Sequence, residues 1–106
     1  MITSKQRAYL RSLANGIPTI CQLGKDGISQ NLIKQLDDAL EARELIKTHV
    51  LENAPVTPRE ACTELSIILS AEPVQVIGGK FVLYRPAKDK EKRQIELPKT
   101  KKPSRV

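Results

Sequence analysis

Apolar residues recur at helical spacing in three parts of this 106-residue chain. Those parts are about residues 4–15, about residues 29–42, and the segment from Thr57 to about Leu69. Each begins with a side chain that can accept a hydrogen bond from the first helical N–H groups, namely Thr3, Ser29 and Thr57. Gln6, three residues after Thr3, completes the form of a capping box. The helix start at Thr57 is the clearest, because Pro58 and Glu60 occupy the first and third helical positions after it. The pattern predicts three amphipathic helices.

Four shorter apolar segments have the length and composition of β-strands: Thr19–Leu23, Glu44–Glu52, Val74–Ile77 and Phe81–Tyr84. Gly78-Gly79 between the last two predicts an antiparallel hairpin, whereas a strand–helix–strand connection favours parallel neighbours. We therefore predict an α/β (α+β) fold in the order helix, strand, helix, strand, helix, strand, strand. Its four strands would form one mixed sheet with helices packed on it.

The distribution of charge divides the chain into two parts. The formal net charge is +6, and residues 87–106 carry eight Lys or Arg against three acids. This segment lacks aromatic residues and is interrupted by proline, so we predict one folded domain over residues 1–86 and a basic, flexible tail over 87–106. Since residues 1–86 are nearly neutral, a folded body that binds a polyanion must use a local patch.

Composition excludes several classes of function. No apolar run is long enough to span a membrane and the N-terminus lacks an apolar signal region, so we expect a cytoplasmic protein. Cys21 and Cys62 are not in a metal-binding spacing, and we expect them to be reduced and buried. With His49 they are too few for a zinc site, and we expect no metal and no cofactor.

The segment from Leu23 to Ser29 is the main candidate for function. Gly24 and Gly27 flank Lys25-Asp26 at the predicted strand-to-helix junction, where backbone can approach a ligand closely. Bare N–H groups, the positive end of the helix dipole and the Lys25 ammonium favour an anion, most simply a phosphate. The same residues also suit an ordinary tight turn followed by a helix cap, because Gly is common in any such turn.

Other candidate sites are weaker. The loop is not a nucleotide-binding Walker loop, which needs four residues between its first Gly and its Gly-Lys pair and Ser or Thr directly after the Lys. Here Gly16 lies too far back, and Asp26 follows Lys25. Asp37 and Asp38 are adjacent on a helix and point apart, and Ser29 has no visible base, so we expect no enzyme and no small-molecule substrate. Lys5, Arg7 and Arg11 form either a solvated helix face or a nucleic-acid face.

Five motifs together make the chain resemble the CRM-domain family of small RNA-binding proteins, in its stand-alone bacterial form linked to assembly of the large ribosomal subunit. The resemblance runs from about Thr3 to Pro98. The matching motifs are Ser4-Lys5-Gln6 with Leu10 and Leu13-Ala14, Leu23–Ser29, Ala39–Lys47, Val74–Gly78, and Val82–Pro86.

The resemblance implies a fold like the C-terminal domain of translation initiation factor three, and a Gly-x-x-Gly loop that touches RNA backbone. It places Gly24, Lys25, Asp26 and Gly27 in that loop. Basic positions of the family pattern fall on Lys5, Lys47 and Arg85, while Arg43 keeps a basic group at a position that can be His. The residues that we expect to contact RNA are therefore Gly24, Lys25, Asp26, Gly27, Ser29, Lys5, Arg7, Arg11, Lys47, Arg43 and Arg85.

We expect a monomeric, non-catalytic protein that contacts rRNA backbone and assists assembly of the large ribosomal subunit. The chain has three aromatic residues, so recognition of shape and backbone fits better than extensive base stacking. The alternative is a protein-interaction adaptor with a basic tail. A small hydrolase would need a cluster of acid, base and nucleophile that the sequence does not contain.

Overall fold

The computed structural model describes residues 2–97 and contains the three expected helices, α1 (Ser4–Ala14), α2 (Gln30–Arg43) and α3 (Pro58–Ile68). Their starts form as the sequence predicts. The Thr3 and Thr57 hydroxyls each accept from the third helical N–H, with Gln6 and Glu60 completing capping boxes. Ser29 Oγ accepts from Leu32 N at 3.1 Å. Local sequence therefore sets where each helix begins.

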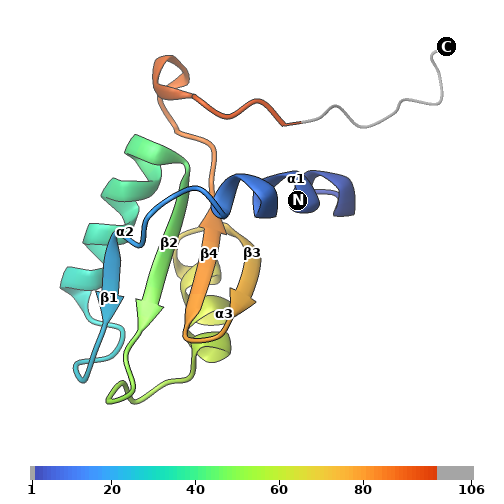
Figure 1. Ribbon diagram of the computed structural model, residues 1–106. Coiled ribbons are helices and arrows are strands. Elements are labelled where there is room, and N and C mark those ends of the chain that lie inside the picture. The colour runs from blue at the N-terminus through green and yellow to red at the C-terminus, as the bar shows by residue number, and fades with distance from the viewer. Residues whose placement is uncertain (1, 98–106) are drawn as a thin grey trace, which may run out of the picture.

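Four strands form one mixed sheet in the order β1-β2-β4-β3 (Figure 1). They are β1 (Cys21–Leu23), β2 (Leu45–Val50), β3 (Glu72–Ile77) and β4 (Lys80–Tyr84). β1 runs parallel to β2, and β4 is antiparallel to both of its neighbours. The predicted fold class, element order and hairpin are thus confirmed.

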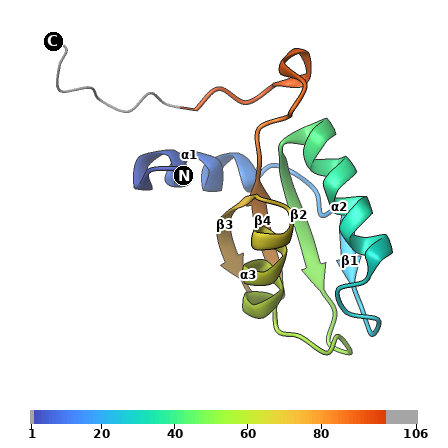
Figure 2. The same cartoon turned by 180° about the vertical axis from the view of Figure 1, so that it is seen from behind.

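Helices cover the two faces of the sheet unequally. α2 and α3 pack on one face, while α1 crosses the other near one end of the strands, as the opposite views of Figures 1 and 2 show. The larger core lies under α2 and α3 and includes Leu36, Leu65 and Phe81. A smaller core lies under α1 and includes Leu10 and Val82. Since α1 crosses only one end, much of its face of the sheet remains uncovered.

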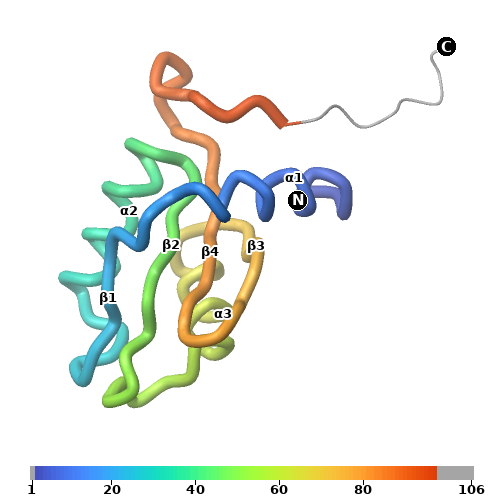
Figure 3. Tube along the Cα trace, viewed as in Figure 1, coloured from blue at the N-terminus to red at the C-terminus, as the bar shows by residue number. Residues whose placement is uncertain are grey.

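The segment that follows β4 corrects the predicted domain boundary. We expected a flexible tail from Ala87, but residues 87–97 are anchored to the domain, and Figure 3 traces their path from β4 past α1. The buried carboxylate of Glu44 accepts from the backbone N–H groups of Ala87, Gln94 and Ile95 at 2.7–2.8 Å. Ile95 and Leu97 pack against the smaller core. The rest of the predicted tail, residues 98–106, lies outside the described residues.

Glu41 holds the same segment, which we call the C-terminal strap (residues 87–97), at a second place. Its carboxylate accepts from Lys88 N and Asp89 N at 2.8 and 3.0 Å. A short 3-10 turn, η1 (Lys90–Lys92), follows. No local pattern in the sequence indicates this arrangement, because the acceptors lie more than 40 residues before the N–H groups they bind.

Cys21 and Cys62 are buried free thiols, as expected. Burial raises the pKa of both, and that of Cys62 to about 11, so each behaves as a small apolar core residue. Within residues 2–97, no helix combines the length and apolar character needed to cross a bilayer.

Candidate nucleic-acid interface

The Gly24–Gly27 loop protrudes from the end of β1 and leads into α2. Lys25 and Asp26, at its tip, are exposed, and Gly24 is partly exposed. A hydrogen bond of 2.9 Å from Gly27 N to Gly24 O closes the turn. The Lys25 ammonium has no ion pair within the described part of the chain. The loop therefore presents at the surface a cation that has no partner among residues 2–97.

A polar hollow of about 220 Å³ separates this loop from the first turn of α2. Gly24, Lys25 and Ser29 line it together with Asn31 and Gln35. The N–H groups of the first turn of a helix have no acceptor within the helix, and the helix dipole adds positive potential at that end. The hollow consequently suits a phosphate group.

Gly27 differs from the exposed backbone position that the sequence suggested. It is buried, its φ is +66°, and a Cβ there would lie 2.9 Å from Pro55 Cγ. Its N–H already donates to Gly24 O. Gly27 therefore shapes the turn and offers no free donor. A Cβ at Gly24, in contrast, would meet only ordinary contact distances, the nearest being 3.5 Å from Leu51 Cδ1.

The three basic residues predicted on α1 do not behave alike. Lys5 and Arg11 are exposed. Arg7 instead binds the start of β3: its Nε donates to Pro73 O at 3.1 Å, and its Nη2 lies 3.9 Å from Glu72 Oε1. Arg7 thus ties α1 to the sheet, and only the other two face solvent without an ion pair within residues 2–97.

Lys47 and Arg43 lie on different parts of the surface. Lys47 is half-buried on β2, beside the end of α1 and the β3–β4 hairpin. Arg43, at the end of α2, is exposed at the rim of a largely apolar hollow of about 280 Å³ that Leu13, Ile17 and Ile95 help to line. The structure therefore does not gather all the predicted basic residues into one patch.

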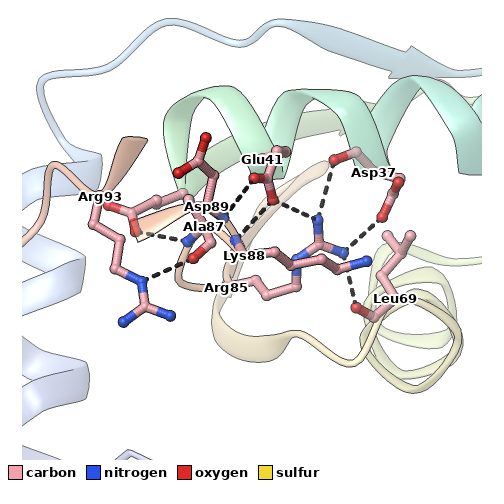
Figure 4. A network of polar contacts seen from close by, with 9 residues as sticks. Asp37, Glu41, Leu69, Arg85, Ala87, Lys88, Asp89 and Arg93 are labelled. Carbon is pink, nitrogen blue, oxygen red and sulfur yellow. Dashed lines mark hydrogen bonds and ion pairs between the residues drawn. The ribbon is translucent and has the colours of Figure 1, made fainter. Parts of the chain in front are cut away.

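Arg85 is a buried structural residue, which corrects its predicted place among the RNA contacts. Its side chain is 8% exposed. Nη1 donates to Asp37 Oδ1 at 2.7 Å and to Leu69 O at 3.1 Å, and Nη2 donates to Asp37 O at 3.2 Å (Figure 4). These bonds join β4 to α2 and to the end of α3, so the guanidinium is not available to a phosphate.

Acidic residues around Arg85 complete this network (Figure 4). The hydrogen bond from Arg85 lowers the pKa of Asp37 below its ordinary value. Glu41 lies 3.9 Å from Arg85 Nη2, and the hydrogen bonds from Asp89 N and Lys88 N lower its pKa. Both carboxylates are therefore held ionised for structural reasons.

Lys80 is a surface cation that sequence reasoning missed. It is exposed at the start of β4 and pairs across the sheet with His49 and Ile77. Strand alternation places Lys47 and His49 on one face, but only the register of the sheet shows that Lys80 shares that face. Among residues 2–97, no group of three or more His, Cys, Asp or Glu side chains could hold a metal ion.

Comparison with known proteins adds a consistent set of similarities. The model of the CRS1 / YhbY (CRM) domain matches residues 2–85. The chain is 45% identical over 98 residues to "Probable RNA-binding protein YqeI" of Bacillus subtilis, covering 92% of this chain and 100% of that one. It is 31% identical over 98 residues to a Haemophilus influenzae protein named "RNA-binding protein", covering 92% and 96%.

A solved structure agrees with the fold described above. The solution structure of the hypothetical protein SAV1595 from Staphylococcus aureus has a TM-score of 0.76 and 52% sequence identity. The match covers 92% of this chain and 100% of that chain.

Proposed function

The chain belongs to the CRS1 / YhbY (CRM) domain family, and from this premise we propose that it is an RNA-binding protein whose Gly24–Gly27 loop grips the sugar-phosphate backbone. The names of the Bacillus and Haemophilus relatives support an RNA partner. The observation that carries the proposal is the polar hollow at the N-terminus of α2, beside the exposed Lys25, which has no ion pair among residues 2–97.

Each part of the loop has a role in this mechanism. Lys25 neutralises a phosphate from the tip of the turn, and the first N–H groups of α2 donate to it from the other side of the hollow. Gly24 lets the RNA backbone approach, while Gly27 and Ser29 fix the turn and the helix start. Such contacts position RNA and carry little sequence information.

We further propose that the RNA is rRNA in precursors of the large ribosomal subunit, and that the protein assists their assembly without catalysis. The resemblance to the stand-alone bacterial members of the family supports this assignment. The near-neutral charge of residues 1–86 also agrees with binding through a local patch.

Lys25→Glu tests the loop directly. We expect roughly tenfold weaker binding to a large-subunit rRNA transcript in an electrophoretic shift assay, and a salt dependence reduced by about one phosphate contact. The tagged variant should also leave the precursor-subunit fractions of a sucrose gradient. Lys90→Glu is the matched control, since Lys90 is an exposed lysine in η1, at the opposite end of the domain from the loop (Figure 1).

Unchanged affinity and sedimentation of Lys25→Glu would refute the loop as the RNA site. Removing residues 98–106 separates this proposal from an adaptor that associates with RNA through its basic tail. That segment carries four Lys or Arg and no acid, and the cut leaves the anchored strap intact. An RNA-binding domain keeps salt-sensitive binding after the cut, whereas a tail-only adaptor loses it.

A further inference from the structure

Side chains from all four strands form one row on the sheet face that α1 leaves partly uncovered. Gln22 of β1 pairs with His49 of β2, His49 pairs with Lys80 of β4, and Lys80 pairs with Ile77 of β3. Residues paired directly across a sheet point to the same face. We call these four residues the open row.

Burial shows where the cover of α1 ends. Gln22, Lys80 and Ile77 are exposed and His49 is partly exposed, with Ile77 at 59%. Val82, two residues farther along β4, is buried in the small core under α1. The open row therefore lies just beyond the helix, at the end of the sheet from which the Gly24–Gly27 loop protrudes (Figure 1).

Three neighbouring hollows make this surface continuous with the loop. The loop hollow shares Gln22 and Gln35 with a polar hollow of about 630 Å³ that His49 and Lys80 also line. Lys80 in turn borders a hollow of about 410 Å³ between the end of α1 and the β3–β4 hairpin, which Lys47, Gln75 and residues 77–79 also line. The three hollows therefore adjoin one another through shared lining residues.

The charges along this path favour a polyanion. Lys25, Lys80 and Lys47 line the three hollows, and Asp26 is the one acid among the described residues that line them. None of the three ammonium groups forms an ion pair within residues 2–97. The remaining polar lining includes side-chain amides and the His49 imidazole, which can donate hydrogen bonds.

We propose that RNA held at the Gly24–Gly27 loop continues across the open row, so that its backbone passes His49 and reaches Lys80 and Lys47. This inference rests on the RNA-binding function proposed above and extends it to a second contact surface. Lys80 and Lys47 would neutralise phosphates, while the amide of Gln22 would bind a phosphate or ribose hydroxyl. Between β1 and β4 the RNA backbone would cross two strand spacings, roughly 10 Å.

The hairpin and Ile77 fit this path. Gly79 lies beside His49, where an added Cβ would come within 3.3 Å of His49 Nε2, so the absence of a side chain leaves room for the imidazole. Ile77 ends the row as an exposed apolar side chain against which a base can pack. Charge together with an apolar end favours a nucleic acid over an acidic peptide.

Amide chemical-shift mapping with a 12-nucleotide oligouridylate tests the path on the intact chain. We expect Gln22, His49 and Lys80 to shift together with Lys25 and Asp26 as the oligonucleotide is added. Shifts confined to residues 24–31 would overturn this inference and leave the proposed function standing. If no amide resonance shifted with this probe or with a large-subunit rRNA transcript, the proposed function itself would be refuted.

Charge reversal supplies a second measurement. We expect Lys47→Glu/Lys80→Glu to bind the oligouridylate at least tenfold more weakly, with the slope of log K against log salt reduced by about 1.4. Lys90→Glu/Lys92→Glu, on η1, makes the same change in net charge and should reduce affinity far less. Equal losses in the two double variants would overturn the inference, as would a 12-residue polyglutamate that binds as tightly as the RNA.

Discussion

Arg85 Nη1 donates to Asp37 Oδ1 across 2.7 Å and thereby joins the residue after β4 to the middle of α2. The guanidinium is buried, whereas Asp37 is partly exposed. The bond therefore holds the sheet to its covering helix at a point where the chain leaves the last strand. It also explains why a cation that looks like an RNA contact in the sequence serves the fold.

Arg85→Ala should lower the free energy of unfolding by about 2–3 kcal/mol, because it leaves Leu69 O and Asp37 O without their donor and removes a half-buried ion pair. Urea denaturation measures the change. Lys34→Ala, which removes the exposed pair with Asp38 on the same helix, should cost less than about 0.5 kcal/mol. Equal costs would contradict the structural role of Arg85.

Acid should weaken the network around Asp37 and Glu41. The pKa of each carboxyl lies below its ordinary value, 3.8 for Asp37 and 4.5 for Glu41. Their contribution is therefore fully present above about pH 5 and is lost as pH falls through the lowered values. We expect Asp37→Asn/Glu41→Gln to flatten the decline in unfolding free energy between pH 5 and pH 3.

Asp38→Asn is the control for this pH dependence, since Asp38 is exposed on α2 and bonds to Lys34. It should leave the decline close to that of the unaltered protein. A decline unchanged in the Asp37→Asn/Glu41→Gln variant would show that other groups govern the acid sensitivity.

Glu44→Gln should loosen the C-terminal strap. The Glu44 carboxylate accepts three backbone hydrogen bonds with both of its oxygens, and an amide nitrogen cannot replace an acceptor. We expect a loss of roughly 1–3 kcal/mol and faster hydrogen exchange at Gln94 and Ile95. Glu96→Gln, at an exposed position in the strap, should change neither quantity.

Gly27→Ala and Gly24→Ala should differ in their effect on the stability of the fold. At Gly27 a methyl group meets Pro55 and the backbone is left-handed, so we expect a loss of about 1–2 kcal/mol. Gly24→Ala meets ordinary contact distances and should unfold close to the parent melting temperature. If both variants had the same melting temperature, the conformational role assigned to Gly27 would be wrong.

Patterns within the chain predicted most of the fold. Capping boxes, apolar spacing and Gly78-Gly79 predicted the three helices, the four strands and their order, which the structure confirms. The same patterns placed the Gly24–Gly27 loop at a strand-to-helix junction. They failed at Ala87, because the composition of a basic segment does not reveal that Glu41 and Glu44 accept its N–H groups.

The same distinction between local and distant interactions holds for the residues of the candidate site. Lys25 could be chosen from sequence because a loop tip has few neighbours that could bury it. Arg7, Arg85 and Lys80 could not be assigned correctly, since their surroundings come from distant parts of the chain. Arg7 bonds to a carbonyl 66 residues away and Arg85 to a carboxylate 48 residues away.

The sequence by itself determined the element types, their order and the loop with its lysine, because turns and helix starts depend on residues a few positions apart. Tertiary structure alone decided which cations face solvent, that residues 87–97 join the domain, and that the open row faces one side of the sheet. Burial and pairing are set by strand register and helix packing, which bring together residues that no local pattern connects.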